Sequence, residues 1–343
     1  MFWEILLICL LLVVGLVLII KGGDNFVDGA SWVAEASGIP KFIVGATIVS
    51  VATTLPEIVV SLISAKAQPA MAIGNAVGSV VFNAGVILGI ALMCQPFKIE
   101  RKDYAFKGIL VVAIMALMLL FSFQGVDLNN LSFESEGVFG YIGSAILLIL
   151  FVVFIIENVI SAKKNALESA KLSSLEDGEE DEKVPTDKKS IITNILKLVL
   201  GAAAIAVGAI LLKDNAVELA RIALIPEAVI GVTILAIGTS LPELVTMIIA
   251  VKKGQASLSV GNIIGANTID LSLILPLSAF IAGGNGVPVA SAHLLVTMPV
   301  TLVILAISII PTLIFKKFSR WQGITIFAIY LAYFVYNIVS VVA

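Results

Sequence analysis

Long apolar runs recur along the whole chain, and short polar connections separate most of them. A bilayer span needs about 20 mostly apolar residues, and ten segments meet that length. They lie near residues 2–20, 40–66, 70–94, 105–124, 137–159, 191–220, 227–250, 257–282, 289–314 and 322–342. We expect the first to be a retained span that continues through a polar stretch to about residue 36. The pattern predicts an all-α membrane protein with ten transmembrane helices.

The composition excludes a soluble protein. Hydrophobic residues make up 59% of the chain and charged residues 13%, and the mean hydropathy is +1.11. A soluble domain carries about 25% charged residues. Cys9 and Cys94 both lie in apolar runs, so neither a disulfide framework nor a thiolate metal site is predicted. The predicted environment is a lipid bilayer, with no resident cofactor, no nucleic-acid partner and no obligate protein partner.

One long polar stretch, residues 161–190, divides the chain into a first five-span repeat (1–160) and a second one (191–343). Six acidic residues lie between positions 176 and 182. So charged a segment buries too little apolar surface to fold alone, which predicts a solvated linker. A calcium-sensing role is the alternative, but the run lacks the ligand spacing of a calcium loop. We expect the segment Ala166–Lys183 to be replaceable by a short flexible spacer.

The basic residues predict the orientation in the membrane. Of the 21 lysines and arginines, only Lys66 and Arg221 fall in the even-numbered connections. Lys21 and Lys213 lie within predicted spans, and the others lie in the odd-numbered connections. Because basic loops stay in the cytoplasm, the linker is predicted to be cytoplasmic and both termini to lie outside. Five spans precede the linker, so the second repeat enters the membrane inverted, as in many secondary transporters.

Internal sequence similarity supports the repeat. Residues Gly45–Glu57 (GATIVSVATTLPE) align without gaps with Gly231–Glu243 (GVTILAIGTSLPE), with seven of thirteen positions identical. Further on, Gly74–Asn83 (GNAVGSVVFN) aligns with Gly261–Asp270 (GNIIGANTID). Similar stretches in corresponding spans of two halves indicate duplication.

Each of the first pair of motifs places a carboxylate in the middle of a span. Glu57 and Glu243 are flanked by apolar residues, and an acid at membrane depth is costly unless it is functional. Each follows a proline, which removes an amide donor and predicts unwound backbone. Unwound backbone is tolerated there only where it lines a cavity or is buried in protein. The motifs thus supply carboxylate, hydroxyl and carbonyl oxygens, which calcium prefers.

The neighbouring spans carry polar stripes at helical spacing. These are Asn75, Ser79 and Asn83 in the third span, and Asn262, Ala266 and Asp270 in the eighth. Glycines at 74, 78, 261 and 265 predict close contact with another helix. The stripes could serve only as contacts between helices, but the two glutamates nearby favour cation ligands. The polar stripes contain no histidine or cysteine, which argues against zinc or copper and for sodium, calcium or magnesium.

These paired motifs resemble the two alpha-repeats of the sodium/calcium exchangers in the calcium/cation antiporter superfamily. The resemblance implies a ten-helix fold of two inverted five-helix repeats, with four cation sites at mid-membrane and a cell-membrane location. It implies exchange of calcium for sodium, with spans one and six sliding across a fixed core. The implied ligand positions are Ser50, Thr53, Thr54, Glu57, Ser79 and Asn83 in the first repeat, and Ala236, Thr239, Ser240, Glu243 and Asp270 in the second.

Two positions depart from the family pattern. Ala266 stands where serine is usual, so one hydroxyl ligand is missing. Asp270 stands where potassium-independent animal exchangers have asparagine and the potassium-dependent branch has aspartate. Potassium-dependent exchange is therefore one alternative to sodium/calcium exchange. Calcium/proton antiport is the other, and it ranks second because proton-coupled relatives have asparagine in place of threonine-serine before the glutamate.

Other classes fit less well. An intramembrane protease needs a Gly-x-Ser-Gly or Gly-x-Gly-Asp motif, and the nearest stretches, Gly238–Leu241 and Lys21–Asp24, match neither. An ion channel is usually a ring of identical subunits around a filter, whereas this chain supplies two repeats of its own. The sequence predicts a transporter and no enzyme activity.

Overall fold

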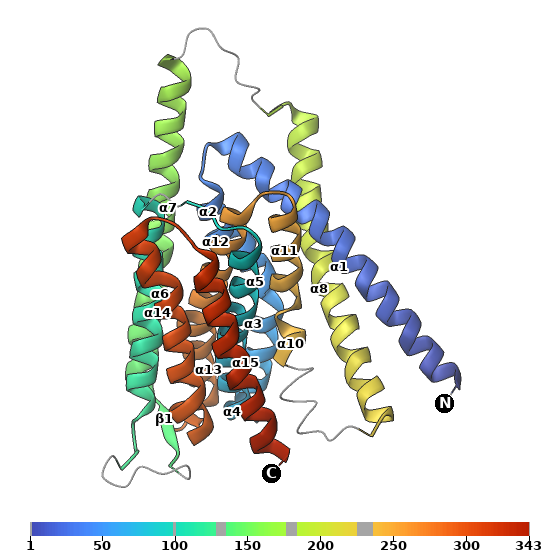
Figure 1. The fold of residues 1–343 in the computed structure, drawn as a ribbon, viewed down its shortest axis with the longest axis vertical. Coiled ribbons are helices and arrows are strands. Elements are labelled where there is room, and N and C mark those ends of the chain that lie inside the picture. Colours follow the sequence, from blue (N-terminus) through green and yellow to red (C-terminus); the bar gives the residue numbers. More distant parts are fainter. Residues whose placement is uncertain (1, 99–100, 128–134, 176–183, 225–235, 343) are drawn as a thin grey trace.

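The computed structural model describes residues 2–98, 101–127, 135–175, 184–224 and 236–342. Within them, nine helical segments are long and apolar enough to cross a membrane. They pack into one bundle, with a short pair of strands at one end (Figure 1). The nine segments coincide with nine of the ten predicted spans. The seventh predicted span, 227–250, begins outside the described residues, and its described remainder forms two short helices.

The first repeat contains one long helix, two interrupted spans and two further helices. The long helix predicted to continue past residue 20 is confirmed. The elements are α1 (Phe2–Ser37), α2 (Lys41–Val44), the π-helical turn η1 (Gly45–Val49), α3 (Ser50–Ala67), α4 (Pro69–Phe82), the π-helical turn η2 (Asn83–Ile87), α5 (Leu88–Cys94), α6 (Arg101–Ser122) and α7 (Tyr141–Leu175).

The second repeat follows the same plan, again with π-helical turns inside its spans. The described elements are α8 (Lys188–Ile222), α10 (Ala236–Thr239), α11 (Leu241–Lys252), α12 (Ala256–Ile269), the turn η5 (Asp270–Ile274), α13 (Leu275–Ala282), the turn η6 (His293–Thr297), α14 (Met298–Phe315) and α15 (Arg320–Val342).

Two short strands lie at the predicted starts of the fifth and ninth spans. β1 (Gly137–Phe139) pairs antiparallel with β2 (Val287–Val289), so the fifth span begins at Tyr141 and not at 137, and the ninth begins just after the predicted 289. Gly137 lies so close to the Ser122 carbonyl that an added Cβ would be 2.0 Å from its oxygen. Pro288 lacks an amide proton and suits the edge of such a pair.

The linker is partly helical. α7 runs to Leu175 and α8 begins at Lys188, so the segment predicted as a solvated linker is helical at 161–175 and 188–190. Residues 161–175 contain several good helix formers, and they extend an existing helix without a new nucleation step. Ser169 of this extension lies against Gly38 at the end of α1. The acidic run at 176–182 lies outside the described residues.

α1 and α8 pack along each other on one flank of the bundle (Figure 1). Their backbones touch at glycines spaced seven residues apart. An added Cβ on Gly15 would lie 3.0 Å from the Gly208 carbonyl oxygen, and one on Gly22 would lie 2.9 Å from that of Gly201. Small residues of this kind let helices in a bilayer gain close van der Waals contact. The two helices therefore form a tightly packed pair.

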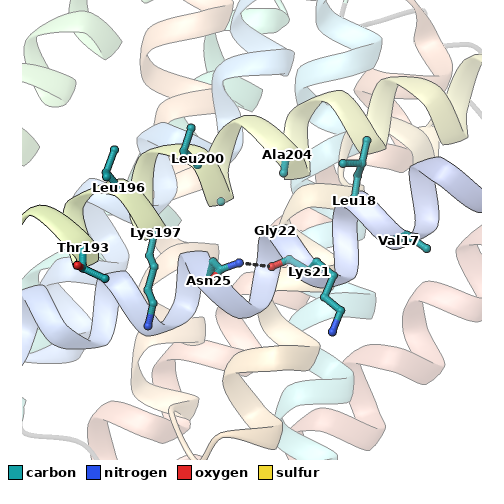
Figure 2. Close-up of a pocket in the computed structure, with 11 residues that line it drawn as sticks. Val17, Leu18, Lys21, Gly22, Asn25, Thr193, Leu196, Lys197, Leu200 and Ala204 are labelled. Atoms are coloured by element: carbon teal, nitrogen blue, oxygen red, sulfur yellow. Dashed lines mark hydrogen bonds between the residues drawn. The ribbon is translucent and has the colours of Figure 1, made fainter.

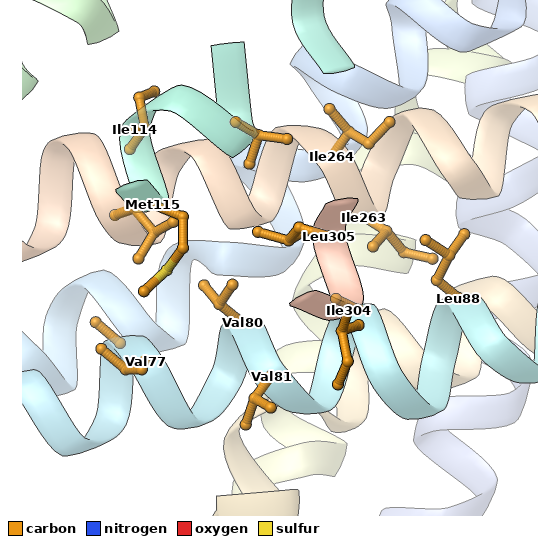
Figure 3. Close-up of a cluster of buried hydrophobic side chains, with 14 of the residues drawn as sticks. Val77, Val80, Val81, Leu88, Ile114, Met115, Ile263, Ile264, Ile304 and Leu305 are labelled. Atoms are coloured by element: carbon orange, nitrogen blue, oxygen red, sulfur yellow. The ribbon is translucent and has the colours of Figure 1, made fainter. Parts of the chain in front are cut away.

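The rest of the bundle shares one apolar core. Figure 3 shows its centre, where α4 and α5 meet α6, α12 and α14. Val80 and Ile263 are fully buried there, beside Ile114 of α6 and Ile304 of α14. Because side chains from both repeats interdigitate, this part of the bundle forms a rigid support for the polar residues beside it.

Glycines bring the two repeats into backbone contact. An added Cβ on Gly261 of α12 would lie 2.1 Å from the Phe42 carbonyl oxygen, and one on Gly265 would lie 2.6 Å from that of Ala46. The predicted close approach of α12 is thus confirmed. Repeat symmetry places the counterparts of these partners at 228–236, mostly outside the described residues. The similar approach expected for Gly74 and Gly78 stays a prediction.

Candidate cation site

The first motif places four polar side chains on α3, directly after the π-helical turn η1. They are Ser50, Thr53, Thr54 and Glu57, and all are buried, Glu57 to 2% exposure. A π-helical turn inserts an extra residue into the helix, and such turns are frequent at functional sites. The helix therefore directs the oxygens of these four side chains into the interior of the bundle.

Pro56 does not interrupt α3. The sequence predicted unwound backbone at both motif prolines, but this helix continues from Ser50 to Ala67. Pro56 still removes the donor that the Ala52 carbonyl would accept. Local π-helical adjustment and contacts with neighbouring helices can compensate for such a loss in a membrane helix. The prediction was wrong for Pro56, and the irregular backbone lies upstream in η1.

The second motif does break the helix. α10 ends at Thr239 and α11 begins at Leu241, with Ser240 between them. Pro242 lies in the first turn of α11, where its missing amide proton costs nothing. Ser240 and Glu243 are buried. Ala236 is the first residue of α10, and its side chain is not among those that the structure describes.

Aligned residues of the two repeats begin matching π-helical turns. Asn83 is the first residue of η2, and Asp270 is the first residue of η5. Both side chains are buried to 1% exposure, as is Ser79 one turn before Asn83. The duplication thus extends from the sequence to an uncommon backbone geometry.

Hydrogen bonds join these residues across the two repeats. Thr53 Oγ1 donates to Asn262 Oδ1 at 3.1 Å, and Thr54 Oγ1 donates to Glu243 Oε1 at 3.4 Å. A third hydrogen bond between the repeats runs from Ser240 Oγ, the donor, to Ser79 Oγ at 3.3 Å. The structure therefore brings the two motifs and their neighbouring helices into one polar cluster.

Several buried oxygens of this cluster have no hydrogen-bond partner within the described residues. They are both carboxylate oxygens of Glu57, Oε2 of Glu243, Oδ1 of Asn83 and of Asp270, and Oγ1 of Thr239. A buried acceptor without a partner is costly. Carboxylate, amide and hydroxyl oxygens are ligands that sodium and calcium accept, so a bound cation would satisfy them.

The three acids of the cluster interact electrostatically. When ionised, Glu57 would be repelled by both Glu243 and Asp270, and Asp270 by Glu243. No three acidic, histidine or cysteine side chains in the described ranges converge as one metal-binding group. The carboxylates are instead distributed among neutral oxygens, which suits a cluster that holds more than one ion.

One member of the predicted stripe has a structural role. Asn75 Nδ2 donates to Ser61 Oγ of α3 at 2.9 Å. Asn75 therefore serves as a contact between helices, which was the alternative to a cation ligand. Ser79 and Asn83 face the cluster.

Two features were not predicted. Asn267 is buried, and its Oδ1 has no partner in the described residues; its position in the aligned Gly-Ala-Asn stretch was a usable signal. Lys107 is fully buried in α6, with its Nζ 2.6 Å from Glu157 Oε2 of α7. This ion pair could not be predicted, because the two residues lie on different helices far apart in the chain.

Comparison with known proteins identifies the family. The model of the sodium/calcium exchanger protein family matches residues 7–159 and again residues 193–339. The chain belongs to the sodium/calcium exchanger family. Sodium/calcium exchanger MaX1 of Methanosarcina acetivorans is 31% identical over 95% of this chain and 97% of its own. Inner membrane protein YrbG of Escherichia coli is 35% identical over 83% of each chain.

Solved structures of a sodium-calcium exchanger share the fold. The structure of NCX_Mj soaked with sodium and strontium superposes with a TM-score of 0.75 at 27% identity, covering 96% of this chain and 98% of that one. This member of the exchanger family is thus a multi-pass, all-helical membrane transporter built from two inverted repeats, and not an enzyme.

Proposed function

We propose that this protein exchanges calcium for sodium across the cell membrane by alternating access. One observation supports it above all: Glu57 and Glu243, from two inverted repeats, are buried in one cluster of oxygens that lack partners within the described residues. Two carboxylates balance the charge of one calcium ion. The same oxygens can hold sodium, so the two ions would compete for the cluster.

The ligands proposed for these ions are those that the family resemblance implies. Oxygens of Ser50, Thr53, Thr54, Glu57, Ser79 and Asn83 would act with the backbone of Ala236 and with Thr239, Ser240, Glu243 and Asp270. The bonds between Thr53 and Asn262 and between Thr54 and Glu243 span the repeats. The ligands would therefore come from both repeats and belong to the core that stays fixed in this proposal.

The α1–α8 pair is the proposed moving element. Glycine contacts join the two helices closely to each other. Lys253, at one end of α11, forms an ion pair with Asp28 of α1, and its Nζ lies 2.7 Å from Asp28 Oδ1. Movement of a packed pair over a rigid core is how many transporters alternate access. In this proposal, both termini lie outside and the linker is cytoplasmic, as the basic residues predict.

Calcium uptake into proteoliposomes tests the exchange. Vesicles loaded in turn with sodium, with potassium, or with a proton gradient should accumulate calcium only when sodium is inside. Uptake that follows the proton gradient without sodium would favour calcium/proton antiport. Uptake that needs potassium together with sodium would favour potassium-dependent exchange.

The Asp270→Asn variant should keep sodium-driven calcium transport. With calcium bound, Glu57 and Glu243 already balance its charge, and a third buried carboxylate would be uncompensated. We therefore expect Asp270 to be neutral in that state, unless potassium binds beside it. Neutral aspartic acid is close in shape to asparagine, which Asn83 supplies at the aligned position. The measurement is calcium uptake without potassium or a pH gradient. A folded but inactive variant would show that the carboxylate is needed as a charged ligand.

Replacement of the acidic run should also preserve transport. The helical extension to Leu175 contacts α1, so the substitution is restricted to residues 176–183, exchanged for glycine and serine in equal number. We expect sodium-driven uptake within about twofold of wild type, because a solvated charged segment adds little to packing. A large loss in a well-expressed variant would revive the calcium-sensor alternative.

A further inference from the structure

A groove lies on the outer face of the α1–α8 pair. Its volume is about 490 Å³, within the range of ligand sites. Gly22 and Gly201 form its floor, where the two backbones touch. A side chain on either glycine would meet the backbone of the facing helix, so the glycines let the two helices approach closely beneath the groove. Figure 2 shows Leu18 and Ala204 at one end, and Lys197 and Thr193 at the other.

The groove faces away from the core of the bundle. Gly23, the neighbour of Gly22, lies against Ile249 of α11 on the inner side of α1. Val17, Leu196 and Leu200 of the groove are each at least half exposed. Exposed apolar side chains on a transmembrane helix contact the acyl chains of lipid. The groove is therefore open to the bilayer.

Two lysines line this groove, and no acidic residue does. Lys21 is exposed, Lys197 is partly exposed, and neither forms an ion pair within the described part of the chain. The nearest acids of α1, Asp24 and Asp28, instead contact Lys253 at the end of α11. A charged residue without a partner inside a membrane span requires a partner from elsewhere.

The contacts of α1 place both lysines near one membrane surface. Asp24 and Asp28 meet Lys253, which caps α11 at its polar end. Gly29 lies against Leu198, so Lys197 is level with that region. Lys21 lies eight residues before Gly29, about 12 Å deeper, and its long side chain can extend back toward the surface. Basic connections predict this surface to be cytoplasmic.

We propose that the groove binds one anionic phospholipid of the cytoplasmic leaflet. Lys21 and Lys197 would hold the headgroup phosphate from two helices, and the Thr193 hydroxyl can donate to the same phosphate. Leu18, Leu196 and Leu200 would line an acyl chain. A lipid held in this way would join α1 to α8 across their glycine contacts. The proposal concerns binding alone and does not depend on which ions the protein carries.

Native mass spectrometry of the full-length protein tests the site. Phosphatidylglycerol and phosphatidylcholine with identical acyl chains are titrated into the detergent-purified protein. The wild type should retain one phosphatidylglycerol in preference to phosphatidylcholine. In the Lys21→Gln/Lys197→Gln variant, affinity for phosphatidylglycerol should fall about 30-fold, which corresponds to about 2 kcal/mol for two lysines. The Lys21→Arg/Lys197→Arg variant should retain the lipid.

The matched control removes two lysines elsewhere. Lys163→Gln/Lys164→Gln takes the same charge from exposed positions on α7 and should leave lipid retention unchanged. Leu200→Trp keeps both lysines but narrows the groove, and it should weaken the binding of both lipids. Equal retention of the two lipids by the wild type, or unchanged retention by the double glutamine variant, would overturn the proposal. Displacement of phosphatidylglycerol by inorganic phosphate alone would assign the groove to free anions and also overturn it.

Discussion

Glu57→Gln and Glu243→Gln should each reduce sodium-driven calcium uptake below about a tenth of wild type, which corresponds to at least about 1.4 kcal/mol. Each substitution keeps the size of the side chain but removes one of the two charges that balance calcium. Both residues are buried, so solvent cannot replace the lost charge. The measurement is initial uptake into proteoliposomes at matched protein content.

Glu218→Gln is the matched control for this pair. Glu218 is an exposed acid of α8, 3.9 Å from Arg221, and exposed ion pairs of this kind contribute little. We expect its uptake to equal that of wild type. Retention of more than about a tenth of normal uptake in either Glu57→Gln or Glu243→Gln would place the transport site elsewhere.

Gly261→Ala should destabilise the protein by about 3 kcal/mol or more and reduce transport with it. The added methyl would lie 2.1 Å from the Phe42 carbonyl oxygen and 3.0 Å from the Ala46 amide nitrogen. Both are backbone atoms, so no side chain can rotate away. The clash separates α12 from α2 and η1, next to the cluster. Gel filtration after heating in detergent measures the loss of folded protein.

Ser259→Ala, on the same helix, is the comparison for Gly261→Ala. Ser259 is equally buried, but its hydroxyl has no partner in the described residues. Its removal should leave thermal stability close to wild type. A Gly261→Ala protein as stable as Ser259→Ala would mean that α12 does not pack on α2 as closely as the structure indicates.

The sequence predicted most of the fold because hydrophobicity and helix length are local properties of a membrane span. Internal duplication identified Glu57 and Glu243 as equivalent residues, and the structure brings both into one cluster. The backbone at the two prolines was harder to predict. The same Leu-Pro-Glu motif leaves α3 continuous, whereas in the second repeat the helix is interrupted at Ser240. Packing around each proline, and not the motif itself, decides where the helix breaks.

Long-range and edge features could not be read from one sequence. The pairing of Lys107 with Glu157 depends on how α6 and α7 face each other. The strands at 137–139 and 287–289 form only because their two loops meet. The extension of α7 to Leu175 depends on a helix that begins in the membrane and continues beyond it. In each case, the pattern of hydrophobic residues carried no information about the contact on which the feature depends.

Sodium flux driven by calcium tests the exchange most directly. Proteoliposomes loaded with calcium and placed in radioactive sodium should accumulate sodium, whereas vesicles loaded with choline should not. Glu57→Gln vesicles should show no difference between the two conditions. Equal sodium uptake by wild type with and without internal calcium would contradict obligatory exchange of the two ions at one site.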